Sequence, residues 1–390
     1  FGLRQSPRCW NETFKEFMNS IGLYDNVYSP GFYVSKNKKI MVAAYVDDCI
    51  LAAENDEELD KIEQILRDRF SLKIVGVMKE NKLDTDILGM DLHYDYNEGT
   101  ITLGMKSYIT RLKEQYPDII NNDMKNMELP HVTTYEINPK EDELILGKKD
   151  YKKRVKYLQE LIGKLNYIRS RGRIDIEFAV GKVARLVLYP HDKVIKAAEK
   201  ILKYVYSTRD VEMTFQREHI NNNYTITVVC DASLASEYDL KSRAGGIIWL
   251  GSNFFHGFSK KSSIICESSA EAELDAINTG DKLALLLKLK LEKLTGQHTV
   301  EINLITDSKP ALDWLKQDYF KARTKFLGLR IERLKERLND KQLIVRKIKG
   351  LDNTADPLTK PVAKKDFEKL VQVLQHQLTS QVLLPITVPW

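Results

Sequence analysis

The stretch Ile40–Asp56, "IMVAAYVDDCILAAEND", places two adjacent carboxylates, Asp47 and Asp48, between two apolar runs. Asp is depleted from strands and two neighbouring like charges repel each other, so the pattern costs stability unless a positive group lies beside it. The apolar flanks predict a core β-hairpin with both carboxylates at its tip. Mg²⁺ suits such an oxygen-rich tip, and paired ions about 4 Å apart clamp the oxygens of a phosphoryl transfer. A simple surface turn is the alternative interpretation.

Length and charge allow several domains and a polyanionic partner. The chain has 390 residues, of which 43% are hydrophobic and 29% are charged, as in an ordinary globular protein of two or three domains. Its net charge is only +5, but residues 151–210 contain fifteen Lys or Arg against six Asp or Glu. This excess favours a segment that faces nucleic acid, although solvated helix faces explain part of it.

The cysteines and the chain start limit the class of protein further. Cys9, Cys49, Cys230 and Cys266 form no CxxC pair, which argues against a zinc site and a disulfide framework and favours a reducing compartment. No apolar run has the length of a membrane span, so no membrane partner is expected. Because the first residue is Phe1, we expect a segment of a longer polypeptide.

Periodicity divides the chain into three parts. The first part predicts a helix, a meander of hairpins, an amphipathic helix and a further strand pair. A polar linker and three helices follow, and the last part predicts three strands, a helix, a strand, a helix and a strand, an α/β domain of its own. The corresponding ranges are 11–21, 31–53, 56–70 and 86–105, then 116–150, 151–169, 174–189 and 191–206, then 224–350.

Four acids of the last part lie where strands end or helices begin. Asp231 is predicted to end the strand "TITVVC" and Asp307 the strand "INLIT", and ligands bind at the carboxyl ends of strands in open α/β sheets. Glu273 lies in the predicted first turn of a long helix, where it could simply favour the helix start. Asp356 could be a turn residue before Pro357. Each acid alone is as consistent with a structural role as with a functional one.

Several motifs, in order along essentially the whole chain, resemble copia-type (pseudoviral) LTR retrotransposon polymerases, most closely those of budding yeasts. The motifs that carry the resemblance are "FGLRQSPRCW" at 1–10, "YVDD" at 45–48, "ILGMDL" at 87–92 and "LIGKLNYIRSRGRIDIEFAVGKVARL" at 161–186. "YVDD" resembles the catalytic box of reverse transcriptases. The order of the motifs is more specific than any single one.

The resemblance implies roles for the first carboxylate site. Asp47 and Asp48 would hold two Mg²⁺ ions, or Mn²⁺ as a substitute, that activate the primer 3′-hydroxyl. Arg4, Gln5 and Tyr45 would approach the incoming dNTP. The family needs a third carboxylate on a strand upstream of "GLRQSP", so we expect the polymerase site to be incomplete in this sequence.

The four acids of the last part resemble the metal-binding acids of ribonuclease H domains, again with two Mg²⁺ ions. There, the ions bridge the scissile phosphate and one activates the water that cuts the RNA strand of an RNA–DNA hybrid. Glu271 is a second candidate, but "EL-A" after Glu273 matches the family better. Four close carboxylates repel one another, so we expect at least one raised pKa without metal. The His that many ribonucleases H place before the fourth acid is absent from "KIKGLDNTADPLTK".

The expected fold class is α+β followed by α/β: a partial polymerase palm with thumb and connection helices, then a ribonuclease H-like domain. The expected divisions are 1–117 for truncated palm and thumb, 118–150 for the linker, 151–215 for the connection helices, 224–360 for the ribonuclease H-like domain, and 361–390 for a C-terminal helix and tail.

The expected function is RNA-directed DNA synthesis coupled to RNA cleavage in hybrids. Arg169, Arg171 and Arg173 would help to hold a duplex by its phosphates, or form a solvated helix end. The expected partners are an RNA–DNA hybrid, template-primer, dNTP and the upstream Gag and Pol parts of the element, with a dimer allowed. The expected locations are cytoplasmic virus-like particles and the nucleus. A catalytically dead relic, or a host-adopted nucleic-acid-binding scaffold, is the alternative, and a fragmentary record of an intact element is another.

Overall fold

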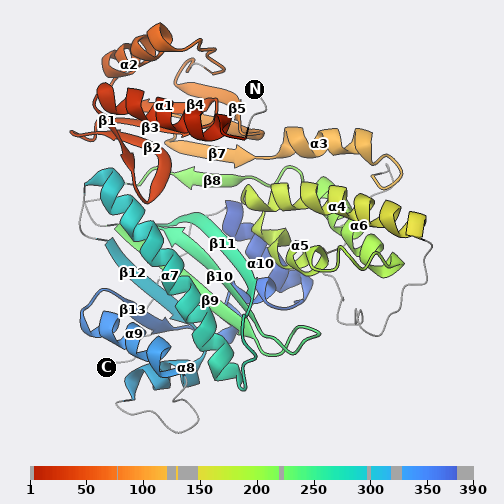
Figure 1. Ribbon diagram of the computed structural model, residues 1–390. Helices are drawn as coiled ribbons and strands as arrows, with labels where there is room; N and C mark the ends of the chain where they lie inside the picture. The colour runs from red at the N-terminus through yellow and green to blue at the C-terminus, as the bar shows by residue number, and fades with distance from the viewer. Residues whose placement is uncertain are drawn as a thin grey trace.

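The computed structural model describes residues 4–76, 78–120, 129–130, 148–218, 224–296, 300–317 and 327–375. These residues form two four-stranded sheets, a group of packed helices and a five-stranded sheet covered by helices (Figure 1). The expected α+β and α/β fold class is therefore confirmed. Most of the predicted linker and the predicted tail after residue 375 lie outside the described residues.

The N-terminal part is an antiparallel sheet with two helices. The strands lie in the order β1-β2-β3-β4, and β3 and β4 form the hairpin predicted around the Asp pair. Its core joins the helices to the sheet through residues such as Phe14, Val42 and Ile62. The bounds are α1 Ser6–Ser20, β1 Leu23–Asn26, β2 Ser29–Ser35, β3 Ile40–Tyr45, β4 Asp48–Ala53 and α2 Asp56–Arg69.

The second sheet corrects the predicted strand pair. Residues 86–95 do not form one strand, because Leu88 and Gly89 have positive φ and turn the chain between Ile87 and Met90. A fourth strand, β8, comes from after the connection helices and pairs with β7. Residues 151–215 are therefore not helical throughout. The bounds are β5 Lys82–Ile87, β6 Met90–Asp95, β7 Thr100–Gly104 and β8 Met213–Gln216.

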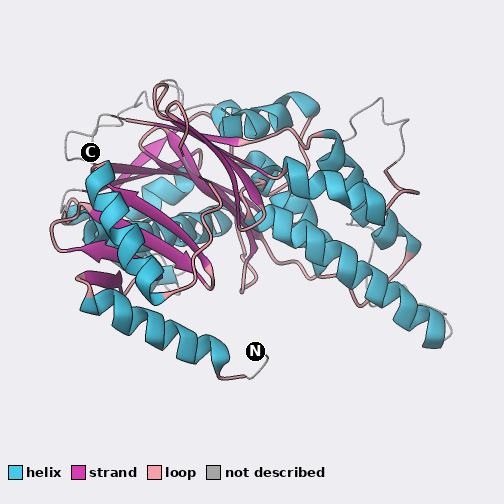
Figure 2. Ribbon diagram, turned by 90° about the horizontal axis from the view of Figure 1, so that it is seen from above, coloured by secondary structure: helices cyan, strands magenta, loops and turns pink. Residues whose placement is uncertain are grey.

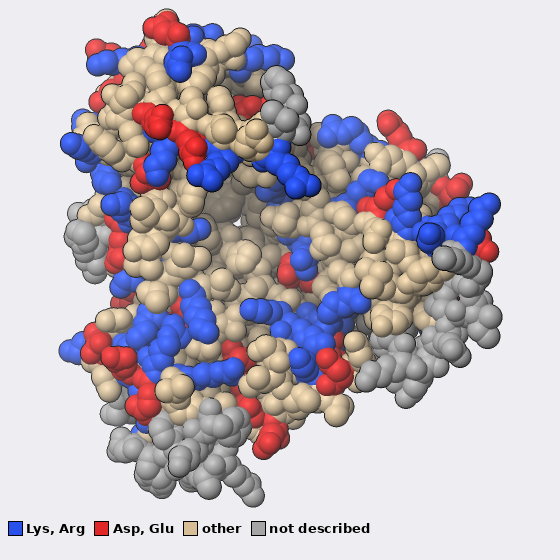
Figure 3. All heavy atoms as spheres, viewed as in Figure 1, with Lys and Arg blue, Asp and Glu red and all other residues tan. Residues whose placement is uncertain are grey.

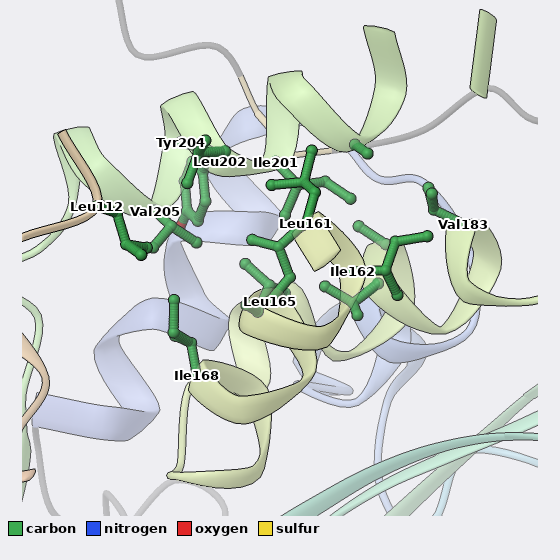
Figure 4. Close-up of a cluster of buried hydrophobic side chains, with 14 of the residues drawn as sticks. Leu112, Leu161, Ile162, Leu165, Ile168, Val183, Ile201, Leu202, Tyr204 and Val205 are labelled. Carbon is green, nitrogen blue, oxygen red and sulfur yellow. The ribbon is translucent and has the colours of Figure 1, made fainter. Parts of the chain in front are cut away.

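The connection helices pack around a shared apolar core (Figure 4). In this view Leu161 and Leu165 of one helix face Ile201 and Val205 of another. Helix α10, near the C-terminal end of the described chain, adds Phe367 to the same core. The bounds are α3 Lys106–Gln115, α4 Lys148–Ser170, η2 Ile174–Ile176, α5 Glu177–Ala184, α6 Asp192–Ser207 and α10 Lys364–Gln375.

The five-stranded sheet has the order β11-β10-β9-β12-β13, antiparallel from β11 to β9 and parallel from β9 to β13. Helix α7 packs across one face (Figures 1 and 2). Ile174 of the connection and Leu370 of α10 pack on the other face. Two helices, rather than the single one expected, lie between β12 and β13. The bounds are β9 Tyr224–Ser233, β10 Arg243–Leu250, β11 Asn253–Lys261, α7 Ser269–Thr295, β12 Val300–Thr306, α8 Lys309–Lys316, α9 Gly328–Asn339 and β13 Ile344–Lys347.

The N-terminal sheet also contacts the end of α7. Lys38 Nζ donates to the Lys293 carbonyl at 3.0 Å, and Asn26 Nδ2 donates to the Lys290 carbonyl at 3.3 Å. A cation at a helix C-terminus is favourable because the last carbonyls have no partner within the helix. No helix among the described residues is long and apolar enough to cross a bilayer.

Helix α7 approaches β9 so closely that one position tolerates no side chain. A Cβ added at Gly280 would lie 2.7 Å from Cys230 Sγ and 3.1 Å from a Val228 methyl carbon. We predict that Gly280→Ala lowers the free energy of unfolding by about 1–2 kcal/mol, because overpacking outweighs the helix propensity of Ala. Gly163→Ala, on α4 with open space around the position, should raise it by about 0.5–1 kcal/mol. Thermal melts compare the two, and equal shifts would contradict the close packing.

Candidate active sites

Three of the four predicted acids meet at one edge of the five-stranded sheet. Ligand oxygens of Asp231, Asp307 and Asp356 all lie within 4.8 Å of one another. Strands β9 and β12 are parallel neighbours, which places Asp231 beside Asp307 directly after β12. Asp231 does not end its strand as predicted, because β9 continues to Ser233 by pairing with β10. Asp356 begins the 3₁₀ turn η5, Asp356–Leu358.

The fourth acid, Glu273, lies on α7 beside this trio. It is in the second turn, not in the predicted first turn, because the helix begins at Ser269. Burial, followed by repulsion from Asp231 and Asp307, raises the pKa of Glu273 to about 9. Glu271 serves the helix start instead: its carboxylate accepts the Glu267 amide at 2.7 Å. Glu273 thus remains the candidate whose carboxylate lies near Asp231 and Asp307.

The cluster is only partly neutralised by its neighbours. Burial and the nearby Asp356 raise the pKa of Asp231 to about 8, which matches the expected raised pKa. Asn353 Nδ2 donates to Asp231 Oδ1 at 3.1 Å, and the Thr359 hydroxyl donates to the other oxygen. Lys360 Nζ lies 3.1 Å from Asp356 Oδ2. Lys360 is thus the cation that faces the acids, and sequence reasoning missed it although it lies four residues after Asp356.

The donor set fits a hard divalent cation. Asp356 Oδ1 and Glu273 Oε2 are buried carboxylate oxygens without a hydrogen-bond partner among the described residues. Buried polar atoms normally have partners, so unpartnered carboxylate oxygens beside a carboxylate cluster indicate room for a cation. Oxygen-only ligation suits Mg²⁺ or Mn²⁺ better than zinc.

The structure places Asp47 and Asp48 at the tip of the β3–β4 hairpin, as predicted. Both are exposed, and Tyr45, 60% exposed, pairs with Asp48 across the turn. Trp10 Nε1 donates to the Val46 carbonyl at 2.6 Å and thereby ties α1 to the tip. No third acid joins this pair in the part of the chain that the structure describes.

The residues predicted to approach the nucleotide lie at the start of α1. Gln5 is the N-cap residue, but its side chain makes no capping hydrogen bond, and Arg4 is exposed beside it. Trp10, from the same motif, makes the contact with the tip, and sequence reasoning gave it no role. Its place in the motif "FGLRQSPRCW" was the available signal.

The predicted Arg cluster divides into three different environments. Arg173 is only 3% exposed, pairs with Asp175 at 2.7 Å and donates to Thr208, so its assignment to phosphate binding is corrected to a structural one. Arg171 stacks on Tyr167 with 5.1 Å between its guanidinium carbon and the ring centre. Arg169 forms an ion pair with Glu177, with 3.4 Å between Arg169 Nη1 and Glu177 Oε1.

The surface carries positive charge around a concavity. Figure 3 shows a hollow below the N-terminal sheet, with Lys and Arg side chains along its rim. Positive side chains around a concavity are suited to a phosphate backbone, and such contacts add affinity with little sequence preference.

Comparison with known proteins finds a family match for the N-terminal part. Residues 1–129 match the reverse transcriptase (RNA-dependent DNA polymerase) family. The chain as a whole is 27% identical over 379 residues, 96% of its length, to the truncated transposon Ty1-A Gag-Pol polyprotein of Saccharomyces cerevisiae, a copia-type element. The expected relationship to copia-type elements is confirmed. The chain spans 31% of the length of that relative.

Solved structures give weaker likenesses. A foamy viral protease-reverse transcriptase in complex with double-stranded DNA is 14% identical, with a TM-score of 0.47, over 89% of this chain and 49% of that one. Ribonuclease H1 from Halobacterium salinarum is 15% identical, with a TM-score of 0.26, over 35% of this chain and 94% of that one.

The raised pKa values predict a stability that falls with pH when no metal is bound. In the folded chain, Asp231 stays protonated up to about pH 8 and Glu273 up to about pH 9. In the unfolded chain, both carboxyl groups lose their protons near their ordinary pKa of about 4. The folded state therefore binds more protons, and stability decreases as pH rises through this range.

Asp231→Asn should reduce this pH dependence, because it removes one titrating group and keeps the side-chain shape. Melting temperatures in EDTA between pH 5 and 9 measure the slope for both chains. Mg²⁺ should raise the wild-type melting temperature most at high pH, since it competes with protons for the acids. Equal slopes in wild type and variant would contradict the assignment.

Proposed function

We propose that the chain cuts the RNA strand of an RNA–DNA hybrid at the cluster formed by Asp231, Glu273, Asp307 and Asp356. The observation that carries the proposal is the convergence of ligand oxygens of three of these acids within 4.8 Å of one another, at one edge of the parallel pair β9 and β12. A copia-type relative over 96% of the chain supports the same activity.

Each residue of the site would have its own role in metal binding or phosphate binding. Asp231 and Asp307, on adjacent strands, would hold cations between them, and Asp356 and Glu273 would complete the ligand set with their unpartnered oxygens. Mg²⁺ held by these residues would activate a water for attack and offset the negative charge of the scissile phosphate. Asn353 and Thr359 hold the Asp231 carboxylate in one orientation. Lys360 supplies a positive charge that can meet the phosphate once the acids are neutralised.

The polymerase half of the proposal rests on the Asp47 and Asp48 tip and on the family match of residues 1–129. Two exposed carboxylates can hold cations beside a primer end, and Trp10 holds the tip that carries them. RNA-directed DNA synthesis on template-primer with dNTP would need a further carboxylate from another part of the polypeptide. The Gag-Pol name of the relative supports Gag and other Pol parts as partners. The locations that we propose are cytoplasmic virus-like particles and the nucleus.

Cleavage of a labelled RNA–DNA hybrid tests the nuclease proposal. We predict Mg²⁺-dependent cutting that EDTA abolishes and that Asp307→Asn lowers by more than about 100-fold, beyond the effect of losing an outer-shell partner. Asp47→Asn is the matched control, since it removes the same kind of charge at the other site and should leave cutting unchanged. Fluorescence anisotropy with the same hybrid checks that both variants still bind.

Two outcomes would contradict this assignment. Cutting that survives Asp307→Asn would mean that the metal site lies elsewhere. A folded wild-type chain that binds the hybrid and never cuts it would support the nucleic-acid-binding scaffold instead.

A further inference from the structure

A buried ionic cluster joins connection helix α5 to the ribonuclease H-like sheet. Its centre is Glu237, in the loop between β9 and β10, which is 5% exposed. Lys182 Nζ lies 3.0 Å from Glu237 Oε1, Arg185 pairs with the other oxygen, and Arg243 of β10 donates to Oε1 at 2.9 Å. Lys182 lies on α5 and Arg185 is the residue that caps its C-terminal end, so the sheet does not neutralise Glu237 by itself.

The cluster continues from Arg243 to Ser259 of β11. Arg243 Nη1 donates to the Ser259 hydroxyl oxygen at 2.9 Å. The Ser259 backbone lies beside the carboxylate of Glu177, the first residue of α5. The Ser259 side chain is therefore held through Arg243, and its backbone faces the connection helix.

The Ser259 hydroxyl links this cluster to the loop that carries Asp356. Its proton is donated to the Leu358 carbonyl at 2.5 Å. Leu358 ends the turn that begins with Asp356, and the next residue, Thr359, donates to Asp231. One hydrogen bond thus separates Ser259 from a backbone segment that places two of the four acids.

The sheet beneath this segment leaves it little room to move. A Cβ added at Gly245, which pairs with Asp231 across β9 and β10, would lie 2.7 Å from a Thr359 methyl carbon and 2.9 Å from Leu358 Cβ. The segment Leu358–Thr359 therefore packs tightly against β10 beside Asp231. The hydrogen bond from Ser259 to the Leu358 carbonyl holds it in place there.

We propose that Ser259 is a positioning residue for the carboxylate cluster, through which helix α5 of the connection sets the geometry that Asp231 and Asp356 offer to metal ions. The inference rests on the proposed nuclease function and adds a dependence of that site on the connection. An ordinary packed interface would not need these charges, because burying them is costly and apolar residues of similar volume often stabilise as well. A connected polar network instead favours one arrangement.

Three serine variants test the proposal in the full chain. Ser259→Ala removes the hydrogen bond to Leu358, and Ser259→Thr keeps a hydroxyl as the conservative variant. Ser207→Ala, at the end of α6, is the matched control, because that hydroxyl bonds only to carbonyls of its own helix. Mn²⁺ affinity by titration calorimetry is the first readout, with Asp307→Asn as the blank. The Mg²⁺ concentration for half-maximal hybrid cleavage is the second.

We expect Ser259→Ala to weaken Mn²⁺ binding by about 10-fold, as loss of an outer-shell partner does, and to raise the Mg²⁺ requirement for cleavage in parallel. Affinity for the hybrid should stay unchanged. Ser259→Thr should restore metal affinity, and Ser207→Ala should behave as wild type. A role in stability alone would lower the melting temperature and leave metal affinity unchanged.

Unchanged Mn²⁺ affinity in Ser259→Ala, when wild type binds Mn²⁺ and cuts, would overturn the positioning role and leave the nuclease proposal intact. An equal loss in Ser207→Ala would overturn it as well, because the effect would then be unspecific. A wild-type chain that neither binds Mn²⁺ nor cuts would overturn the proposed function itself, so the two failures are distinguishable.

Discussion

The parallel pairing of β9 with β12 is the constraint on which the carboxylate cluster depends. Val229 lies opposite Ile305, so the acids two residues further along, Asp231 and Asp307, reach the same sheet edge. Their repulsion is an unavoidable cost of this register. The surrounding loop reduces it with hydrogen bonds from Asn353 and Thr359. The remaining cost appears in the raised pKa values, which connect the fold to metal binding.

Features encoded within a short stretch of chain could be predicted from the sequence. The hairpin tip with Asp47 and Asp48 follows from two apolar runs and the Asp pair between them, over about a dozen residues. The four acids of the last part could be selected because two of them follow apolar strand patterns and because all four, in this order, resemble the acids of ribonuclease H domains. The end of β9 was misplaced by two residues, because its last pair, Ser233 with Arg243, depends on a strand that comes later.

Features that depend on distant partners could not be predicted. Arg173 belongs to a dense positive run, but Asp175 and Tyr204 enclose it, and Tyr204 comes from another helix. From the sequence, strand β8 is expected to belong to the helical segment 151–215. In the structure it pairs with β7 and completes a sheet whose other strands lie within residues 82–104. The link from α5 through Ser259 to Leu358 joins residues about a hundred positions apart and carries no local pattern.

The two carboxylate sites differ in how the repulsion between their acids is reduced. Asp47 and Asp48 are exposed, so water and salt screen their repulsion and the hairpin can form without a cation. Asp231 is 2% exposed, and its cluster must either keep protons or bind metal. Metal binding at that cluster would therefore be coupled to folding, and the sheet that carries the acids is covered on both faces. Helix α7 covers one face, and the connection together with α10 covers the other.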